Sequence, residues 1–144
     1  MPLLRRYDSK KIVEAIQEAE KNTSGEIRVH IQNRAGKDIM AAAEKKFVEL
    51  GMTQTELRNG VLIFVALKDR NFAIIGDSGI NAKVPENFWN ETAEEMLRLF
   101  RQNKITEAVV KGIHSAGLKL KDFFPADNSD INELTDEVSV DEKN

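Results

Sequence analysis

The sequence contains no cysteine among its 144 residues. This absence excludes disulfide frameworks, cysteine-ligated zinc, iron–sulfur clusters and thiol nucleophiles. Histidine is also scarce, because only His30 and His114 occur and they do not form a paired motif such as His-Glu-x-x-His. Any metal ion that the chain binds is therefore expected to have mostly oxygen ligands.

Long hydrophobic runs are missing as well. The longest apolar stretch, residues 61–67, covers seven residues, whereas a transmembrane helix needs roughly 20. The first residues of the chain turn polar before an apolar run of signal-peptide length can form. We therefore expect no transmembrane segment, no export signal and a cytoplasmic location.

Charge is unevenly placed along the chain. The net charge is −3, yet residues 126–144 alone contain seven acidic residues and one basic residue. The remaining body carries a small, dispersed positive excess, which gives no support for nucleic-acid binding. We expect one domain over residues 1–125 and an acidic, flexible tail over 126–144. A docked tail is the alternative, because Ile131, Leu134 and Val138 recur at helical spacing.

Apolar periodicity sets the expected secondary structure. Helical spacing and cap residues predict helices over residues 10–21, 38–50, 85–102 and 105–120. Strands are predicted over residues 26–32, 61–67 and 71–77, and a loop over 77–81. The first strand alternates polar and apolar residues, so we expect His30 at the surface or half-buried. The second strand is apolar on both faces, which is typical of a central strand covered on both sides.

The order of these elements predicts a small α/β fold, a three-layer α/β/α sandwich with a mixed sheet. The first two strands are joined through a helix and should be parallel. The third strand should return beside the second as an antiparallel hairpin. We also expect a monomer.

This topology brings the starts of the first two strands and the end of the third to one edge of the sheet. Glu26, Asn59 and Asp77 should therefore be neighbours, with Asn81 in the following loop able to close over them. Carboxylate and amide oxygens suit a hard divalent cation, so the sequence predicts a site for calcium, or for magnesium, although no EF-hand loop occurs.

A purely structural interpretation of the same residues is open. Asp77 and Asn59 can cap turns through hydrogen bonds to the backbone, as short polar side chains often do. In that case Glu26 would pair with Arg58, and the edge would hold no ligand.

Several segments together resemble the TPM domain family. They are Ser-Gly-Glu-Ile-Arg-Val at 24–29, Arg-Asn-Gly-Val-Leu-Ile-Phe-Val-Ala at 58–66, Ile-Ile-Gly-Asp-Ser-Gly-Ile at 74–80, and the glycines at 112 and 117 before Phe-Phe-Pro at 123–125. The resemblance covers about residues 8–125. It implies an α/β/α sandwich, a divalent cation in a loop-lined cleft, and the acid-phosphatase-like activity ascribed to plant members. By position, the family's acidic cleft corresponds to Glu26, Asn59 and Asp77.

Two functions are compatible with these observations. The first is a metal-modulated binding module that docks onto a protein partner, with a membrane complex as one candidate. The alternative is a metal-dependent phosphomonoesterase, in which Asp77, Glu26 and Asn59 hold the cation, Arg58 stabilises negative charge and water is the nucleophile. The binding module is favoured, because the sequence offers no histidine base and no Asp-x-Asp nucleophile motif.

Overall fold

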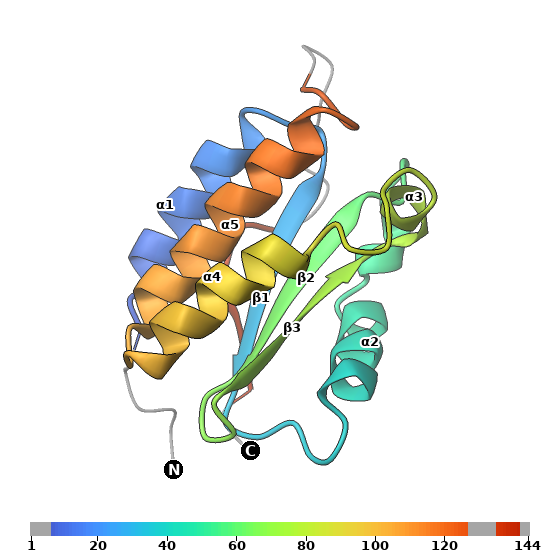
Figure 1. Cartoon of the computed structure of the whole chain (residues 1–144). Coiled ribbons are helices and arrows are strands. Elements are labelled where there is room, and N and C mark those ends of the chain that lie inside the picture. Colours follow the sequence, from blue (N-terminus) through green and yellow to red (C-terminus); the bar gives the residue numbers. More distant parts are fainter. Residues whose placement is uncertain (1–6, 127–134, 142–144) are drawn as a thin grey trace.

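A four-stranded mixed sheet organises the chain (Figure 1). The computed structural model describes residues 7–126 and 135–141. The strands are β1 (Glu26–Gln32), β2 (Gly60–Ala66), β3 (Asn71–Gly76) and β4 (Ser139–Asp141), in the order β3-β2-β1-β4. β1 is parallel to β2 and to β4, and β3 is antiparallel to β2. The predicted α/β fold with a mixed sheet is confirmed, and so are the two predicted strand pairings.

Helices cover both faces of the sheet, but unequally (Figure 1). One face carries α1 (Ser9–Glu20), α4 (Asn90–Arg101) and α5 (Ile105–Lys121). We call it the three-helix face. The other face, here the α2 face, carries α2 (Ile39–Glu49). Within the described ranges, no helix combines the length and the apolar character that crossing a bilayer requires.

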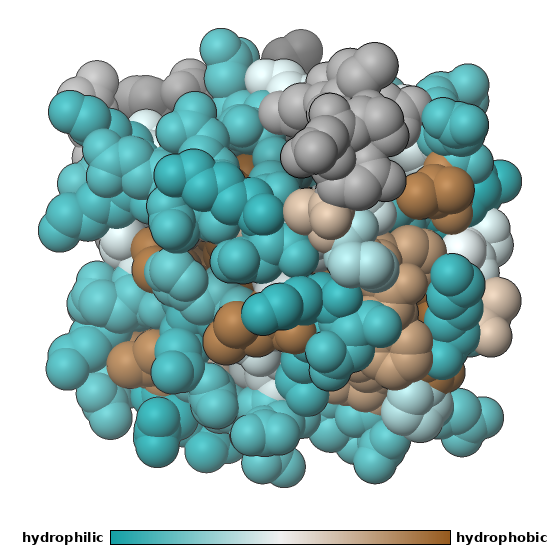
Figure 2. Space-filling view, turned by 90° about the horizontal axis from the view of Figure 1, so that it is seen from above, coloured by the Kyte–Doolittle hydropathy of each residue, from teal (hydrophilic) through white to brown (hydrophobic). Residues whose placement is uncertain are grey.

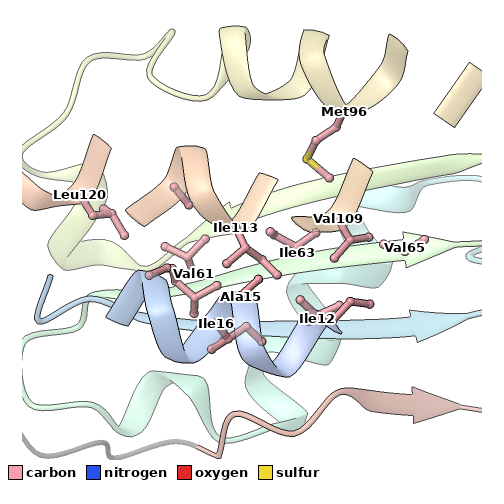
Figure 3. Close-up of a cluster of buried hydrophobic side chains, with 14 of the residues drawn as sticks. Ile12, Ala15, Ile16, Val61, Ile63, Val65, Met96, Val109, Ile113 and Leu120 are labelled. Carbon is pink, nitrogen blue, oxygen red and sulfur yellow. The ribbon is translucent and has the colours of Figure 1, made fainter. Parts of the chain in front are cut away.

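The main hydrophobic core lies under the three-helix face. Alternate residues of a strand point to the same side of a sheet, so Val61, Ile63 and Val65 of β2 meet α1 and α5 (Figure 3). Close helix contacts depend on two glycines of α5. A Cβ atom at Gly112 would lie 2.5 Å from a methionine sulfur of α4, and one at Gly117 would lie 2.9 Å from an alanine of α1. Both positions exclude larger side chains without rearrangement.

A smaller cluster lies under the α2 face. Leu62 and Phe64, the other alternate residues of β2, pack there against Ala43 and Phe47 of α2. Every residue of β2 is buried, which confirms the predicted central strand covered on both sides.

Two local predictions were wrong. The helix predicted over residues 85–102 is α4, which begins only at Asn90. Residues 86–89 form turns instead, in which the Phe88 N–H donates to the Pro85 carbonyl. The predicted loop contains a short helix, α3 (Ser78–Asn81), whose first N–H is capped by the Asp77 carboxylate.

The tail contributes a strand to the sheet. Ser139 is in register with His30 of β1, and Asp141 with Gln32. The half-buried Val138 packs against the main core. Residues 138–141 therefore contact the body, and residues 139–141 do so as a strand rather than through the helical spacing on which the alternative rested. The other two residues of that alternative, Ile131 and Leu134, lie outside the described residues.

The polar side of β1 is buried, which corrects the expectation for His30. Glu26 is 4% exposed, His30 1% and Gln32 6%. His30 lies against the ring of Phe64 and bonds to Ser139 of β4. The polar and apolar residues that alternate along β1 therefore point to a polar and an apolar part of the protein interior, and the polar residues do not face solvent.

Candidate functional site

The predicted edge exists where β1 and β2 begin and β3 ends. Glu26 is in register with Gly60, and its N–H donates to the Asn59 carbonyl at 3.2 Å. The N–H of Asp77 donates to the Gly60 carbonyl from the other side at 3.0 Å. Glu26 and Asp77 therefore flank Gly60, as the strand topology predicts.

The central interaction of this edge is a forked ion pair between Arg58 and Asp77. Arg58 Nε donates to Asp77 Oδ2 at 2.7 Å, and Nη2 donates to Oδ1 at 2.8 Å. Oδ1 also accepts the N–H of Ser78 at 2.7 Å. The hydrogen bond and the negative charge of Asp77 raise the pKa of Arg58. The carboxylate is 6% exposed, whereas the Arg58 side chain is 46% exposed, so a buried anion is balanced by a side chain that water can reach.

The backbone around Arg58 is held in place by a glycine. Arg58 has a φ of +51°, in the left-handed region. Gly79 donates its N–H to the Arg58 carbonyl at 2.8 Å. A Cβ atom at Gly79 would lie 2.2 Å from the Leu57 carbonyl and 2.6 Å from that of Arg58. Only glycine permits this approach, which places Arg58 beside Asp77.

The other predicted ligands are only partly brought together. Asn81 lies beside Asp77 and donates from Nδ2 to the Gly76 carbonyl at 3.1 Å. Asn59 is 2% exposed, and its Nδ2 donates a hydrogen bond to Ser24 Oγ at 3.4 Å. The structural interpretation is also only partly right. Asp77 caps a helix, but Arg58 pairs with Asp77 rather than with Glu26.

These residues suit a divalent cation in their chemistry but do not form a ready cage. Among the described side chains, no group of three or more His, Asp and Glu could hold a metal ion. Asp77 and Asn81 offer the oxygen atoms that calcium prefers. Both oxygens of Asp77 accept hydrogen bonds from Arg58, so a cation at this carboxylate would compete with the guanidinium for the same oxygen atoms.

An open groove of about 410 Å³ lies beside the ion pair, between α2, β3 and α3. Its floor and walls include Phe47 and Val48 of α2 and Ile75 of β3, and Asp77 lines it where β3 ends. In Figure 2, a brown-to-tan area lies on the right, the side on which Figure 1 places α2 and α3.

This groove was not predicted from the sequence. Met40 and Val48, which are 46% and 64% exposed, lie outside the buried stripe of α2, to which Phe47 belongs. Apolar residues outside the buried stripe of an amphipathic helix were the feature that could have revealed it.

Two further titratable groups hold the tail against the body. Burial, followed by a hydrogen bond with Asp136, raises the pKa of Glu20 to about 9. Glu20 is therefore protonated near neutral pH, and its Oε2 accepts the N–H of Ile27 at 3.0 Å. Burial lowers the pKa of His30, whose Nδ1 lies 2.9 Å from Ser139 Oγ. The sequence did not indicate the Glu20 contact, since its partner lies at the far end of the chain.

Comparison with known proteins identifies the fold family. The NMR structure of the BA42 protein from the psychrophilic bacterium Bizionia argentinensis shares 44% sequence identity with this chain, with a TM-score of 0.87 and coverage of 92% of each chain. No curated protein matches significantly. The profile of the TPM domain matches residues 2–118. The chain therefore belongs to the TPM domain family, as the resemblance implied.

Proposed function

We propose that this TPM domain is a binding module whose groove receives a partner and whose Asp77 responds to a divalent cation, calcium first and magnesium second. One observation carries the proposal. The buried Asp77 carboxylate is balanced by Arg58, a side chain that is 46% exposed and can leave without uncovering the core. Because water reaches the guanidinium, a divalent cation can take over its charge at Asp77 without leaving the buried carboxylate unpaired.

The residues of this chain have distinct roles in such an exchange. Asp77 and Asn81 would hold the cation through oxygen atoms, with Glu26 as a further carboxylate across Gly60. When bound, the cation supplies the positive charge that Arg58 supplies to Asp77 in its absence. Arg58 is then released at the edge of the groove, where its guanidinium is available to a partner. Binding of the cation thereby changes the surface that a partner meets.

The competing function, a metal-dependent phosphomonoesterase, has less support. It needs a base that activates water beside Asp77. His30 is 1% exposed and bonded to Ser139 and Gln32, which leaves it unsuited to that role. We therefore propose a protein partner for the groove, with a membrane complex as one candidate, and we expect the domain to act as a cytoplasmic monomer.

Calcium titration of three variants tests the proposal. Arg58→Gln removes the competing guanidinium and should tighten calcium binding severalfold. Asp77→Asn should abolish binding. Arg34→Gln is the matched control, because Arg34 pairs with Asp69 through a side chain that is 66% exposed, and it should bind as the wild type does.

Calorimetry gives the affinities, and amide chemical shifts locate the site. Shifts at residues 58 and 77–81 would support the proposed ligands. Two results would contradict the cation exchange: a flat titration of both the wild type and Arg58→Gln at millimolar calcium, or unchanged calcium affinity in a folded Asp77→Asn protein. Magnesium is titrated in the same way to rank the two ions.

A further inference from the structure

One edge of the sheet is unusually open. Within residues 7–126 and 135–141, β3 pairs with β2 and with no other strand. Its sequence, Asn-Phe-Ala-Ile-Ile-Gly, contains neither a charged residue nor proline. Natural sheets usually protect such edges with charges, proline or short strands. The opposite edge follows this rule, because β4 has three residues and includes Asp141.

The groove runs along this open edge. Ile74 and Ile75 of β3 are half-buried and line it. Met40 and Val48 of α2 line it from the other side, with exposures of 46% and 64%. A strand added to β3 would direct alternate side chains into the groove, while its backbone pairs with the outer side of β3.

Two groups of this edge already have side-chain partners, because the Phe72 N–H donates to Asn71 Oδ1 at 2.9 Å and the Gly76 carbonyl accepts from Asn81 Nδ2 at 3.1 Å. The pairing of an added strand therefore centres on Ile74, between these two positions.

Charge decides which kind of strand fits best. Among the described residues that line the groove, the charged side chains are Glu44 and Asp77. Asp77 is already paired with Arg58, so Glu44 supplies the uncompensated negative charge. Glu44 is exposed, and it would attract a basic side chain of the added strand. A second copy of this chain, paired edge to edge, would instead bring a second Glu44 carboxylate to the interface, which is unfavourable.

We propose that the edge of β3 and the adjoining groove bind an extended, apolar and basic segment of a partner protein as an additional strand. The inference rests on the proposed binding function of the groove and names the chemistry of the partner. It concerns the domain without a bound cation, in which Asp77 holds Arg58.

Synthetic peptides test this inference directly. The probe is the acetylated and amidated peptide Val-Thr-Lys-Thr-Val-Thr, which presents valine, lysine and valine on one face of a strand. The same peptide with glutamate in place of lysine tests the charge, and a version N-methylated at alternate residues tests the backbone pairing. We expect saturable binding of the lysine peptide with shifts at residues 71–76, binding about tenfold weaker for the glutamate peptide, and none for the N-methylated peptide.

Protein variants locate the binding surface. Val48→Asp places a charge in the groove and should abolish binding of the lysine peptide. Leu118→Asp is the matched control on α5, because Val48 and Leu118 are each 64% exposed, and it should leave the affinity unchanged. Glu44→Gln should remove most of the preference for lysine over glutamate.

The outcomes separate this inference from the proposed cation exchange. A positive calcium titration without peptide binding at millimolar concentration would overturn the strand-binding inference alone. Peptide binding with a flat calcium titration would support it and reject the cation exchange. Concentration-dependent shifts at residues 71–76 in the protein alone, with dimer formation, would overturn the heterologous partner in favour of a second copy of the chain.

Discussion

The two faces of the sheet differ in how completely helices cover them. On the three-helix face, α5 packs against both α1 and α4 at contacts that Gly112 and Gly117 make possible. On the α2 face, one helix leaves a groove of about 410 Å³, and the polar His30 of β1 lies on this side of the sheet beside Phe64. The same central strand supplies both cores, with Ile63 on one side and Phe64 on the other.

The difference in coverage gives the two faces different roles, one in stability and the other in binding. A closely packed face resists substitution because any lost volume becomes a cavity. An incompletely covered face keeps side chains accessible to a ligand, and elements with fewer buried contacts open more readily. We expect the three-helix face to control global unfolding and the α2 face to control binding.

The largest expected effect is on the free energy of unfolding, when one residue of each face is replaced by alanine. Ile113 of α5 is fully buried, whereas Val48 of α2 is 64% exposed. Ile113→Ala should lower the free energy of unfolding by about 2–5 kcal/mol, because it leaves a cavity. Val48→Ala should change it by less than about 0.5 kcal/mol. Urea denaturation of both variants measures the contrast, and similar losses would show that the α2 face is also essential for stability.

The next effect concerns the proton between Glu20 and the docked tail. The pKa of Glu20 is raised from its ordinary value of 4.5 to about 9. Between these values the unfolded chain has lost a proton that the folded chain retains, so this group lowers stability as pH rises. From pH 5 to pH 8 we expect a loss of roughly 2 kcal/mol, about half of the full linkage value because the side chain is partly exposed.

Glu20→Gln separates the proton from the hydrogen bonds. An uncharged amide can donate to Asp136 and accept from the N–H of Ile27, as protonated Glu20 does. The variant should match the wild type at pH 5 and exceed its stability at pH 8. Glu18→Gln, at a surface residue paired with Lys21, is the control and should keep the wild-type slope. An unchanged slope in Glu20→Gln would contradict the raised pKa.

Most of the fold follows from local patterns in the sequence. Strict alternation and an apolar run located β1 and β2, and the chain order of strands and helices was sufficient to predict their pairing. The meeting of Glu26 and Asp77 near Gly60 followed from that pairing alone. These features depend on periodicity and topology, which a single sequence contains.

The remaining features depend on contacts between distant segments. The pairing of Arg58 with Asp77 requires the left-handed φ of Arg58 and the close approach of Gly79, neither of which leaves a periodic pattern. β4 is too short to be recognised from three residues, and the burial of His30 depends on it. Side-chain partners and short edge strands were therefore beyond prediction.

The smallest expected effect compares the caps of two helices. Asp8 accepts the N–H of Lys11 at the start of α1, and its own N–H donates to Thr106 of α5 at 2.8 Å. Asp38 accepts the N–H of Ala41 at the start of α2. Substitution of a cap residue by alanine usually costs about 1 kcal/mol of helix stability.

Loss of the cap should affect global unfolding on the three-helix face and local opening on the α2 face. α1 cannot fray without opening the main core, so Asp8→Ala should lower the free energy of global unfolding by about 1 kcal/mol. α2 can open locally, so Asp38→Ala should mainly accelerate hydrogen exchange in its first turn and change global stability by less than about 0.5 kcal/mol. Asp8→Asn and Asp38→Asn retain a capping oxygen and should resemble the wild type. An equal global loss in both alanine variants would mean that α2 unfolds together with the core, and the groove would then be as rigid as the three-helix face.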